Sequence, residues 1–513
     1  MQKPSIIIKD LVVRMQENTV LDEISFSLQP NENLAILGEA ESGKTTLAKA
    51  IAGKIRFAGN FVTNFEDTTE KHARIELVEQ RYSFKNLSGT NDFYYQQRFN
   101  SFDANDAPTI FEEILKVYAN DSKKNLPCLS GGQATGSKAD NINSTLEILG
   151  IDHLKNSPLI QLSSGEHKRF QLVKALVNPP KLLILDTPYT GLDILSVKKL
   201  NNILGGISEK GTQIILIPGT FPIPDFITHI ASLRNKRLNF FGEKEDFLPE
   251  KLISTKEIQF SYNNDLSAVS NEEFHFDTVV KMRNISIKYG DHTIIKNLNW
   301  EIARGERWLL KGRNGAGKSS LLSFITGDHP QAYANEIYLF GKRRGTGESI
   351  WDIKQKIGYI SPELHAYFDK NISCFQAIGS GYFDTIGLFR KLSKEQHNTI
   401  LQWLDFLHLS DMSTKPLHSI SSGFQRMILL ARALVKNPPL LILDEPCHGL
   451  DQKQSDQFIS LIDHICSESN KTLIYVSHNE NNVSSCIQNV LELKNDGYQF
   501  YKINKPVKLA VAS

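Results

Sequence analysis

The sequence predicts two α/β domains in tandem, each built around a mainly parallel β-sheet. Its length of 513 residues is enough for two to four domains, at roughly 150 residues per domain. Long stretches of the first half recur in the second half. Both halves also contain short, continuous apolar runs, which are typical of buried parallel strands.

The internal repeat is visible in three pairs of segments. A period of more than 250 residues indicates two whole domains rather than a solenoid of small units. We place the first domain at 1–248, a polar linker at 249–278 and the second domain at 279–513. The linker holds six acidic and two basic residues, so it is mildly acidic. The paired segments are GEAESGKTTL (38–47) with GRNGAGKSSL (312–321), LSSGEHKRFQLVKALV (162–177) with ISSGFQRMILLARALV (420–435), and NPPKLLILDTPYTGLD (178–193) with NPPLLILDEPCHGLD (437–451).

The local patterns justify the α/β prediction element by element. The segment 34–53 passes from an apolar strand through a glycine-containing loop into an amphipathic helix. The sequence LLILD at 182–186 and 440–444 predicts two buried strands, and IILI and TLIYV predict two more. Long polar, helix-like stretches precede each SSG sequence, and they predict a helical subdomain inserted in each domain.

Composition excludes several classes of protein. Hydrophobic residues make up 40% and charged residues 22%, which is ordinary for a globular protein, and the net charge is +1. That balance lacks the basic excess of a typical nucleic-acid binder. Five cysteines without CxxC spacing predict no disulfide framework and fit a reducing compartment. We expect no signal peptide, because the apolar run in the first residues, MQKPSIIIKDLVVRMQ, is too short and is broken by charge. We also expect no membrane span, because apolar runs of 18 or more residues are lacking.

The pattern GxxxxGK[ST] occurs once in each half and predicts two phosphate-binding loops of the P-loop NTPase type. The glycines let backbone N–H groups surround a phosphate, the following helix presents its positive end, and the lysine neutralises β- and γ-phosphate oxygens. A single match would be weak evidence, but two in the same strand–loop–helix context are not. The candidate nucleotide-binding residues are Gly38, Gly43, Lys44, Thr45 and Thr46 in the first half and Gly312, Asn314, Gly315, Ala316, Gly317, Lys318, Ser319 and Ser320 in the second.

Two aspartates complete a predicted Mg²⁺ site in each half. Asp186 and Asp444 each end an LLILD run, where P-loop NTPases place a carboxylate that acts with the hydroxyl of Thr45 or Ser319. The alternative interpretation of either aspartate is a polar residue in a turn after a strand. The predicted cofactors are therefore ATP and Mg²⁺.

The order of these motifs resembles that of ATP-binding-cassette (ABC) ATPases over nearly the whole chain. Each half has a phosphate loop, an SSG sequence about 20 residues before LLILD, and a GLD sequence after it. The resemblance implies ATP hydrolysis, an antiparallel β part at the start of each domain, and head-to-tail pairing of the domains. It also implies that the signature sequence of one domain contacts the nucleotide of the other. The signature candidates are Ser163, Ser164, Gly165 and Glu166 in the first domain and Ser421, Ser422 and Gly423 in the second.

A second signature-like sequence, LSGGQ at 129–133, is interpreted as a decoy. Glycine, serine, aspartate and asparagine follow it, which break helices, and the second half has no counterpart. By contrast, LSSGEHKRFQLVKAL at 162–176 predicts an apolar-periodic helix directly after its signature. In the second domain, Phe424 departs from the family pattern at the position after the SSG sequence.

The resemblance predicts unequal sites. After the strand-end aspartate the family places a glutamate that acts on the attacking water, and the second domain has Glu445 while the first has Thr187. At the family's histidine position the second domain has His478 and the first has Gly219. Glu445 and His478 are therefore the predicted catalytic residues, and the first site is predicted to bind ATP but hydrolyse it slowly or not at all.

Two further positions differ between the halves. At the family's adenine-stacking position the second domain has Tyr289 and the first has Met15. The family's Mg²⁺-sensing glutamine is present in the first domain as Gln80, whereas the second domain has Pro362 there, followed by Glu363. The predicted active site therefore lacks this glutamine unless Glu363 replaces it.

The segment TGDHPQAYANEIYLFGKRRGTGESIWDIKQKIGYIS at 326–361 resembles tandem ATPases of the ModF or photorepair type, which are associated with molybdate transport. This resemblance implies a soluble, cytoplasmic ATP-binding subunit of a transporter, peripheral at the inner face of the membrane when bound to a permease. Two alternatives remain open: a non-transport regulator similar to the translational ABC-F class, and an ATP-driven clamp with slow turnover. The sequence neither indicates nor excludes ribosome or nucleic-acid binding.

Overall fold

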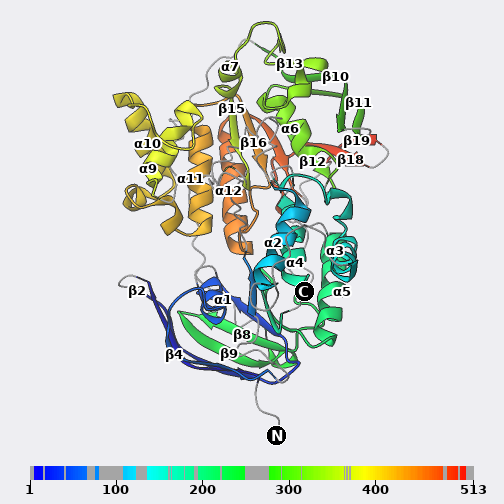
Figure 1. Cartoon of the computed structure of the whole chain (residues 1–513). Helices are drawn as coiled ribbons and strands as arrows, with labels where there is room; N and C mark the ends of the chain where they lie inside the picture. The colour runs from blue at the N-terminus through cyan, green and yellow to red at the C-terminus, as the bar shows by residue number, and fades with distance from the viewer. Residues whose placement is uncertain are drawn as a thin grey trace. The chain divides into compact units, whose positions relative to one another are not determined.

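In the computed structural model, the described part of the chain forms two compact units, one up to residue 248 and one from residue 276 onward (Figure 1). The domain boundaries drawn from the sequence stay predictions. The described residues are 5–15, 18–39, 42–65, 75–79, 108–122, 136–159, 162, 164–177, 180–189, 194–219, 222–248, 276–289, 292–313, 315–362, 364, 368, 371–477, 482–494 and 497–503.

The first unit contains two sheets and a set of helices. Strands β2-β1-β4 form an antiparallel sheet, and a larger sheet has the strand order β5-β6-β7-β3-β8-β9. The bounds are β1 (Ile6–Met15), β2 (Asn18–Leu28), β3 (Leu34–Gly38), α1 (Lys44–Ile51), β4 (Ala58–Thr63), β5 (Ile75–Val78), α2 (Ile110–Ser122), α3 (Gly136–Leu149), α4 (Ser164–Leu176), β6 (Leu182–Asp186), α5 (Ile194–Glu209), β7 (Gln213–Ile217), β8 (His229–Arg234) and β9 (Arg237–Glu243).

The second unit repeats this plan. Its antiparallel sheet has the order β11-β10-β13-β14, and its larger sheet the order β15-β16-β17-β12-β18-β19. The bounds are β10 (Thr278–Tyr289), β11 (His292–Ala303), β12 (Arg307–Gly312), α6 (Lys318–Thr326), β13 (Glu336–Leu339), β14 (Lys342–Arg343), α7 (Ile350–Lys354), β15 (Ile357–Ile360), α9 (Cys374–Gly379), α10 (Lys394–Phe406), α11 (Ser422–Leu434), β16 (Leu440–Asp444), α12 (Gln452–Glu468), β17 (Thr472–Val476), β18 (Asn489–Lys494) and β19 (Gly497–Lys502).

The larger sheets are parallel except at one edge. All pairings from β5 to β8 and from β15 to β18 are parallel, and only the hairpins β8–β9 and β18–β19 are antiparallel. In both sheets the strand before the phosphate loop lies next to the strand that follows the LLILD strand. The predicted fold class is therefore confirmed.

Alternation along the LLILD strands explains how each larger sheet is covered on both faces. In β16, Leu441 and Leu443 pack into a core with the helices α9–α12, whereas Leu440 and Ile442 pack into a core with α6 and the antiparallel sheet. Strand β6 divides its side chains between two cores in the same way. Successive side chains of a strand point to opposite faces, so a short all-apolar run is what a doubly covered strand requires.

The inserted helices lie on one side of the second unit. In Figure 1, α9 and α10 lie beside α11, away from the antiparallel strands β10 and β13. The segment after α9 is fixed to α11 by Arg432, whose Nε donates to Ser380 Oγ at 3.0 Å and whose guanidinium also donates to Thr385 O at 3.0 Å. The predicted helical subdomain is thus held directly on the helix that follows the second SSG sequence.

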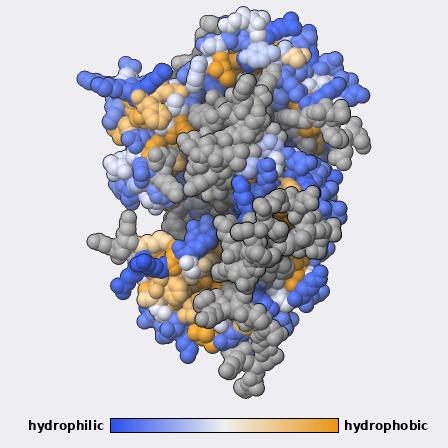
Figure 2. Space-filling model, in the orientation of Figure 1, coloured by the Kyte–Doolittle hydropathy of each residue, from blue (hydrophilic) through white to orange (hydrophobic). Residues whose placement is uncertain are grey.

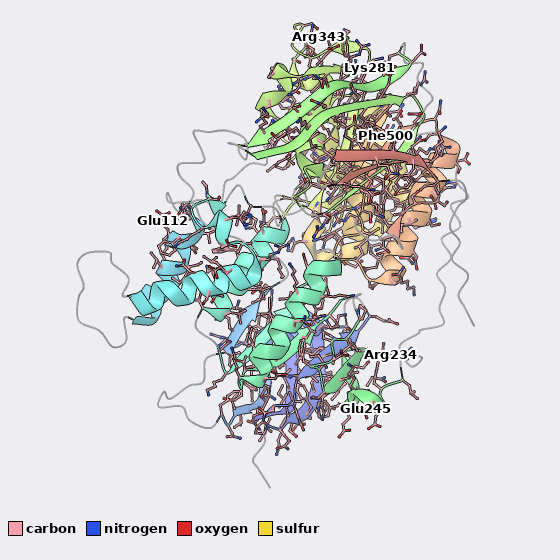
Figure 3. The ribbon with its side chains drawn as sticks, turned by 90° about the vertical axis from the view of Figure 1, so that its right-hand side faces the viewer. Glu112, Arg234, Glu245, Lys281, Arg343 and Phe500 are labelled. Atoms are coloured by element: carbon pink, nitrogen blue, oxygen red, sulfur yellow. The ribbon has the colours of Figure 1, made fainter. Side chains whose placement is uncertain are left out.

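The described surface is mostly hydrophilic on the face shown in Figure 2, with smaller hydrophobic areas. Lys281 on β10 and Arg343 on β14 carry charge on the antiparallel sheet of the second unit, and Phe500 lies on the edge strand β19 (Figure 3). Among the described residues, no helix is long and apolar enough to cross a membrane.

The close contact between α11 and the segment that follows α9 predicts that one small substitution has a strong effect. A Cβ added at Gly381 would lie 2.0 Å from Arg432 O, so Gly381→Ala should destabilise the second unit by about 1–3 kcal/mol, a typical overpacking cost. Gly206→Ala in α5 is the control, because nothing lies within 4 Å of its Cβ position. Urea unfolding of the full chain should show a lower midpoint for Gly381→Ala only, and equal midpoints would contradict the packing described here.

Candidate nucleotide sites

The two phosphate loops have the same local structure. Strand β3 ends at Gly38 and α1 begins at Lys44, and strand β12 ends at Gly312 and α6 begins at Lys318. The residue before each helix is a glycine with φ of 97° (Gly43) or 91° (Gly317) and no side-chain cap. The first amides of α1 and α6 therefore have no capping side chain, and such a helix N-terminus can accept an anion.

Glycine is required at these N-caps for space as well as for conformation. A Cβ at Gly43 would lie 2.5 Å from Leu21 Cδ2, and one at Gly317 would lie 2.7 Å from Ile294 Cγ2. Each contact is with the hairpin of the antiparallel sheet in the same unit. The loop therefore runs close against that hairpin, which only a residue without a side chain allows.

The two loop lysines fold back over their own loops. Lys44 Nζ donates to Gly38 O at 2.7 Å and to Glu39 O, and Lys318 Nζ donates to Gly312 O at 2.8 Å and to Arg313 O at 2.9 Å. Lys318 is only 7% exposed. Both ammonium groups are thus held at the start of the loop, where they can neutralise phosphate oxygens.

In the first unit the predicted Mg²⁺ ligands lie in direct contact. Thr45 Oγ1 donates to Asp186 Oδ2 at 2.8 Å, and Asp186 is 2% exposed. Its other carboxylate oxygen, Oδ1, has no hydrogen-bond partner among the described residues. Burial raises the pKa of the Asp186 carboxyl, against the opposing effects of the Thr45 hydrogen bond and the Lys168 charge. A buried carboxylate oxygen beside a hydroxyl fits the hard oxygen ligands that Mg²⁺ prefers.

The second unit places Ser319 and Asp444 at the equivalent positions, at the start of α6 and the end of β16. Among the described residues of both units, no group of three or more histidine, cysteine, aspartate or glutamate side chains could hold a metal ion.

The residue after each strand-end aspartate has the same unusual backbone in both units. Thr187 has φ of 48° and Glu445 has φ of 46°, and both lie in the left-handed region. Thr187 N donates to Ile217 O at 2.9 Å, and Glu445 N donates to Val476 O at 3.0 Å. The two side chains therefore start from equivalent positions, and only the glutamate provides a carboxylate there.

The left-handed conformation of Thr187 is strained, because β-branched residues rarely adopt positive φ. The first unit keeps this strained turn although the Thr187 side chain has no carboxylate that could accept a proton. Gly219, at the predicted histidine position, lies close by, since its Cβ position would be 3.5 Å from Thr187 Cγ2. Both substitutions that remove predicted catalytic groups therefore occur at one place in the first unit.

The signature sequences start helices, as the sequence predicts. Helix α4 begins at Ser164 and α11 at Ser422, and Ser421 Oγ accepts from Phe424 N at 3.3 Å as the N-cap of α11. Ser422 Oγ donates to Gln454 Oε1 at 3.2 Å, and the Cβ position of Gly423 lies 3.0 Å from Gln454 Cγ. Gln454 was not predicted from the sequence. With Asp451 of the GLD sequence it forms a capping box at the start of α12.

Several predicted site residues lie outside the described part of the chain. They are Gln80, Asn314, Glu363, His478, Ser163 and the LSGGQ sequence at 129–133. The backbone is described at Tyr289, Ser164 and Gly165, but not their side chains. Pro362 follows β15, where Ser361 Oγ accepts from Leu364 N at 3.0 Å. The roles of all these residues stay predictions.

Sequence reasoning also missed a buried lysine beside the first site. Lys168, in α4, is 4% exposed, and its Nζ donates to Glu79 O at 2.7 Å and to Asp186 O at 3.5 Å. Burial lowers its pKa to about 8. It ties the ends of β5 and β6 to the signature helix. Its counterpart Arg426 instead donates to His448 O at 3.1 Å, so a basic residue at this position of both repeats was the available signal.

Two phosphate loops on parallel α/β sheets, each with a hydroxyl and a strand-end carboxylate, define tandem P-loop nucleotide-binding sites. The family model of ABC transporters matches residues 21–190 and 295–448, and the chain belongs to that family. It is an ATPase with two such domains.

The chain is similar to proteins from both bacteria and yeast. It is 34% identical to the ABC transporter ATP-binding protein ModF of Escherichia coli, over 94% of this chain and 96% of that protein. It is 32% identical to an uncharacterised ABC transporter ATP-binding protein of Schizosaccharomyces pombe, over 94% and 98%. A structure of ribosome-bound archaeal Pelota and ABCE1 aligns with a TM-score of 0.57 at 16% identity, over 96% of this chain and 78% of that one, which shows the fold alone.

Lys168 makes the stability of the first unit depend on pH. Because its folded pKa of about 8 lies below the ordinary 10.5, the unfolded chain binds a proton between these values that the folded chain does not. The free energy of unfolding should therefore rise from about pH 8 to about pH 10.5, by up to about 3 kcal/mol. In urea titrations, Lys168→Met should lack this rise.

Lys174→Met is the control, because Lys174 lies on the same helix but is half-buried and paired with Glu113 at 3.0 Å. This variant should keep the rise between neutral and alkaline pH. The buried-lysine account would be wrong if Lys168→Met and Lys174→Met followed the same pH dependence.

Proposed function

We propose that the chain binds ATP at two sites and hydrolyses it mainly at the site built on the second unit. The observation that carries this proposal is the pair Thr187 and Glu445. Their backbones have matching φ values and matching hydrogen bonds, so the loss of the carboxylate in the first unit is not compensated by a different turn. Removing a general base typically slows a reaction by about 10²–10⁴-fold.

In the proposed reaction Glu445 accepts the proton of the water that attacks the γ-phosphorus of ATP, while the bond from that phosphorus to the β–γ bridging oxygen breaks and ADP leaves. Lys318 and the first amides of α6 bind the phosphate oxygens, where they offset the negative charge that spreads over the transferred group. His478, which follows β17 in the sequence, is proposed to contact the γ-phosphate. Mg²⁺, held by Ser319 and Asp444, would supply additional positive charge to the phosphates.

In the first site we propose ATP binding without efficient hydrolysis. Lys44, Thr45 and Asp186 retain the groups for phosphate and Mg²⁺, and Gln80 is proposed to act with them. Thr187 has no group that can accept a proton at neutral pH. Met15 at the end of β1 offers no aromatic face to adenine, and stacking on an aromatic contributes about 1–3 kcal/mol per base in nucleic-acid complexes.

We also propose that the two units pair head to tail, as the resemblance to the family implies. Ser164 and Gly165 would then complete the second site, and Ser422 and Gly423 the first. The N-termini of α4 and α11 support this proposal, because each helix begins at its signature sequence and can present amides to a γ-phosphate. The acidic linker keeps both units at a high effective concentration.

The asymmetry is tested by a pair of substitutions at equivalent backbone positions. Glu445→Gln should lower the steady-state rate of ATP hydrolysis by about 10²–10⁴-fold, because the amide cannot accept the proton. Thr187→Ala should leave the rate nearly unchanged. Phosphate release from purified full-length chain measures both, and similar losses from the two substitutions would contradict the proposal.

For the biological role, we propose that the chain is the ATP-binding subunit of a transporter, of the molybdate type by resemblance. The support is the similarity to ModF across almost the whole of both chains. The alternative is a non-transport ABC protein that acts on ribosomes or nucleic acid. The short acidic linker counts against this alternative, because translational regulators of the ABC-F class have a long, helical and usually basic linker.

Affinity purification from the native host separates these roles. The chain carrying Glu445→Gln should accumulate in its ATP-bound form and retain a membrane permease, whereas a chain that also carries Lys318→Ala should not. Recovery of ribosomes or of salt-sensitive nucleic acid with the first variant would instead support the alternative role. Recovery of neither in ATP would contradict the proposed transporter role.

A further inference from the structure

In the second unit, side chains from the segment after α6 continue the hydrogen-bond ladder between β10 and β13. Strand β13 pairs with β10 from Val280 to Arg283 and no further among the described residues, which leaves five residues between Arg283 and Tyr289 at the end of β10. Alternate residues of a strand present their N–H and C=O groups at the same edge. Beyond Arg283, this edge of β10 needs other partners for its backbone groups.

Two side-chain amides supply those partners. Asn335 Oδ1 accepts from Ser286 N at 2.9 Å, and Asn335 Nδ2 donates to Ser286 O at 3.3 Å. Gln331 Oε1 accepts from Lys288 N at 3.2 Å, and Gln331 Nε2 donates to Lys288 O at 2.6 Å. Each amide thus reproduces one rung of an antiparallel ladder, and the two rungs are two residues apart along β10.

The residues that hold Gln331 are tied to the phosphate-loop helix α6. His329 is 3% exposed, its Nδ1 accepts from Gln331 N at 3.1 Å, and its ring packs edge-on against Phe324 of α6 with centroids 4.8 Å apart. Asp328 follows α6 and forms a 2.8 Å ion pair with Lys354 of α7. The sequences GDHPQ (327–331) and WDIK (351–354) therefore form one structural cluster. This cluster extends from α6 and α7 to the end of β10.

In the first unit, backbone groups of a strand pair with the corresponding edge of β1. Val12 is the counterpart of Ser286, because Met15 and Tyr289 are 274 residues apart, as are Lys44 and Lys318. There β4 itself pairs as far as Val12, with Ala58 as its partner. The described part of the first unit shows no rung from β4 at Arg14, the counterpart of Lys288. The pair of hydrogen bonds between Gln331 and Lys288 is thus an additional feature of the second unit, which carries the aromatic residue Tyr289.

We propose that Gln331, assisted by Asn335, is a positioning residue that fixes the end of β10 so that Tyr289 is held in place to stack on adenine. This inference rests on the proposed role of Tyr289 in the second site. Without the Lys288 rung, the strand end next to Tyr289 loses two backbone hydrogen bonds on one edge, and ordering the tyrosine then costs part of the stacking free energy on binding.

Equilibrium binding of ATP tests the proposal in full-length chain that carries Lys44→Ala, so that the second site dominates binding. Tyr289→Ala should weaken ATP binding about 5- to 100-fold, the range expected for one base stacked on an aromatic ring. Gln331→Met, of similar length but without the amide, should weaken it about 3- to 10-fold, the effect of a net hydrogen bond or two. Asn335→Leu should have a smaller effect, because its rung is farther from Tyr289.

Three comparisons distinguish positioning from general damage. Gln331→Met should leave competition by inorganic triphosphate unchanged, since that probe has no adenine. In a Tyr289→Ala background it should add no further loss of ATP affinity. Gln355→Met is the matched control, because it removes a 3.0 Å amide bond to Tyr382 O elsewhere in the unit, and ATP affinity should not change.

The outcomes separate this inference from the proposed function. Tyr289→Ala with unaltered ATP binding would overturn the adenine role itself. Weakened binding in Tyr289→Ala but not in Gln331→Met would overturn only the positioning role. Equal losses for ATP and triphosphate, or additive losses in the double variant, would also overturn it. A melting temperature of Gln331→Met close to that of the parent would show that the variant is folded.

Discussion

The arrangement of both candidate sites depends on one turn, which follows the buried LLILD strand in each unit. There a residue in the left-handed region, Thr187 or Glu445, donates its N–H to the neighbouring parallel strand. This bond fixes where the side chain after the aspartate starts, relative to the phosphate loop two strands away. Both residues are strained by their positive φ. In the second unit this strain comes with a carboxylate in a fixed position, whereas in the first unit threonine has the same strain and no carboxylate.

The two units therefore differ in side chains more than in backbone. They share the strand order of the larger sheet, N-cap glycines at positive φ and lysines folded onto their own loops. In the first unit the buried Asp186 contacts Thr45, and the buried Lys168 donates to the backbone of Glu79. The second unit keeps Glu445 and reinforces the strand that ends at Tyr289. These side-chain differences support the proposed division between a first site that retains nucleotide and a second site that hydrolyses it.

Much of this could be predicted from the sequence, because the relevant patterns are local. The LLILD strands, the strand–loop–helix order at Lys44 and Lys318 and the helices after each SSG sequence are all periodic or spacing signals, and the structure shows them. The contacts of Lys168 and Gln331 could not be predicted. Their partners are backbone atoms 89 and 43 residues away, and a single polar residue carries no periodic signal of such a bond.

The central claim is that only the second site turns over, and the fate of bound nucleotide in a single turnover tests it most directly. The full-length chain is loaded with labelled ATP and Mg²⁺, separated from free nucleotide, and sampled over several turnover times. The account predicts that about half of the bound nucleotide becomes ADP at the steady-state rate while the other half stays ATP. Conversion of both halves at the same rate would contradict it.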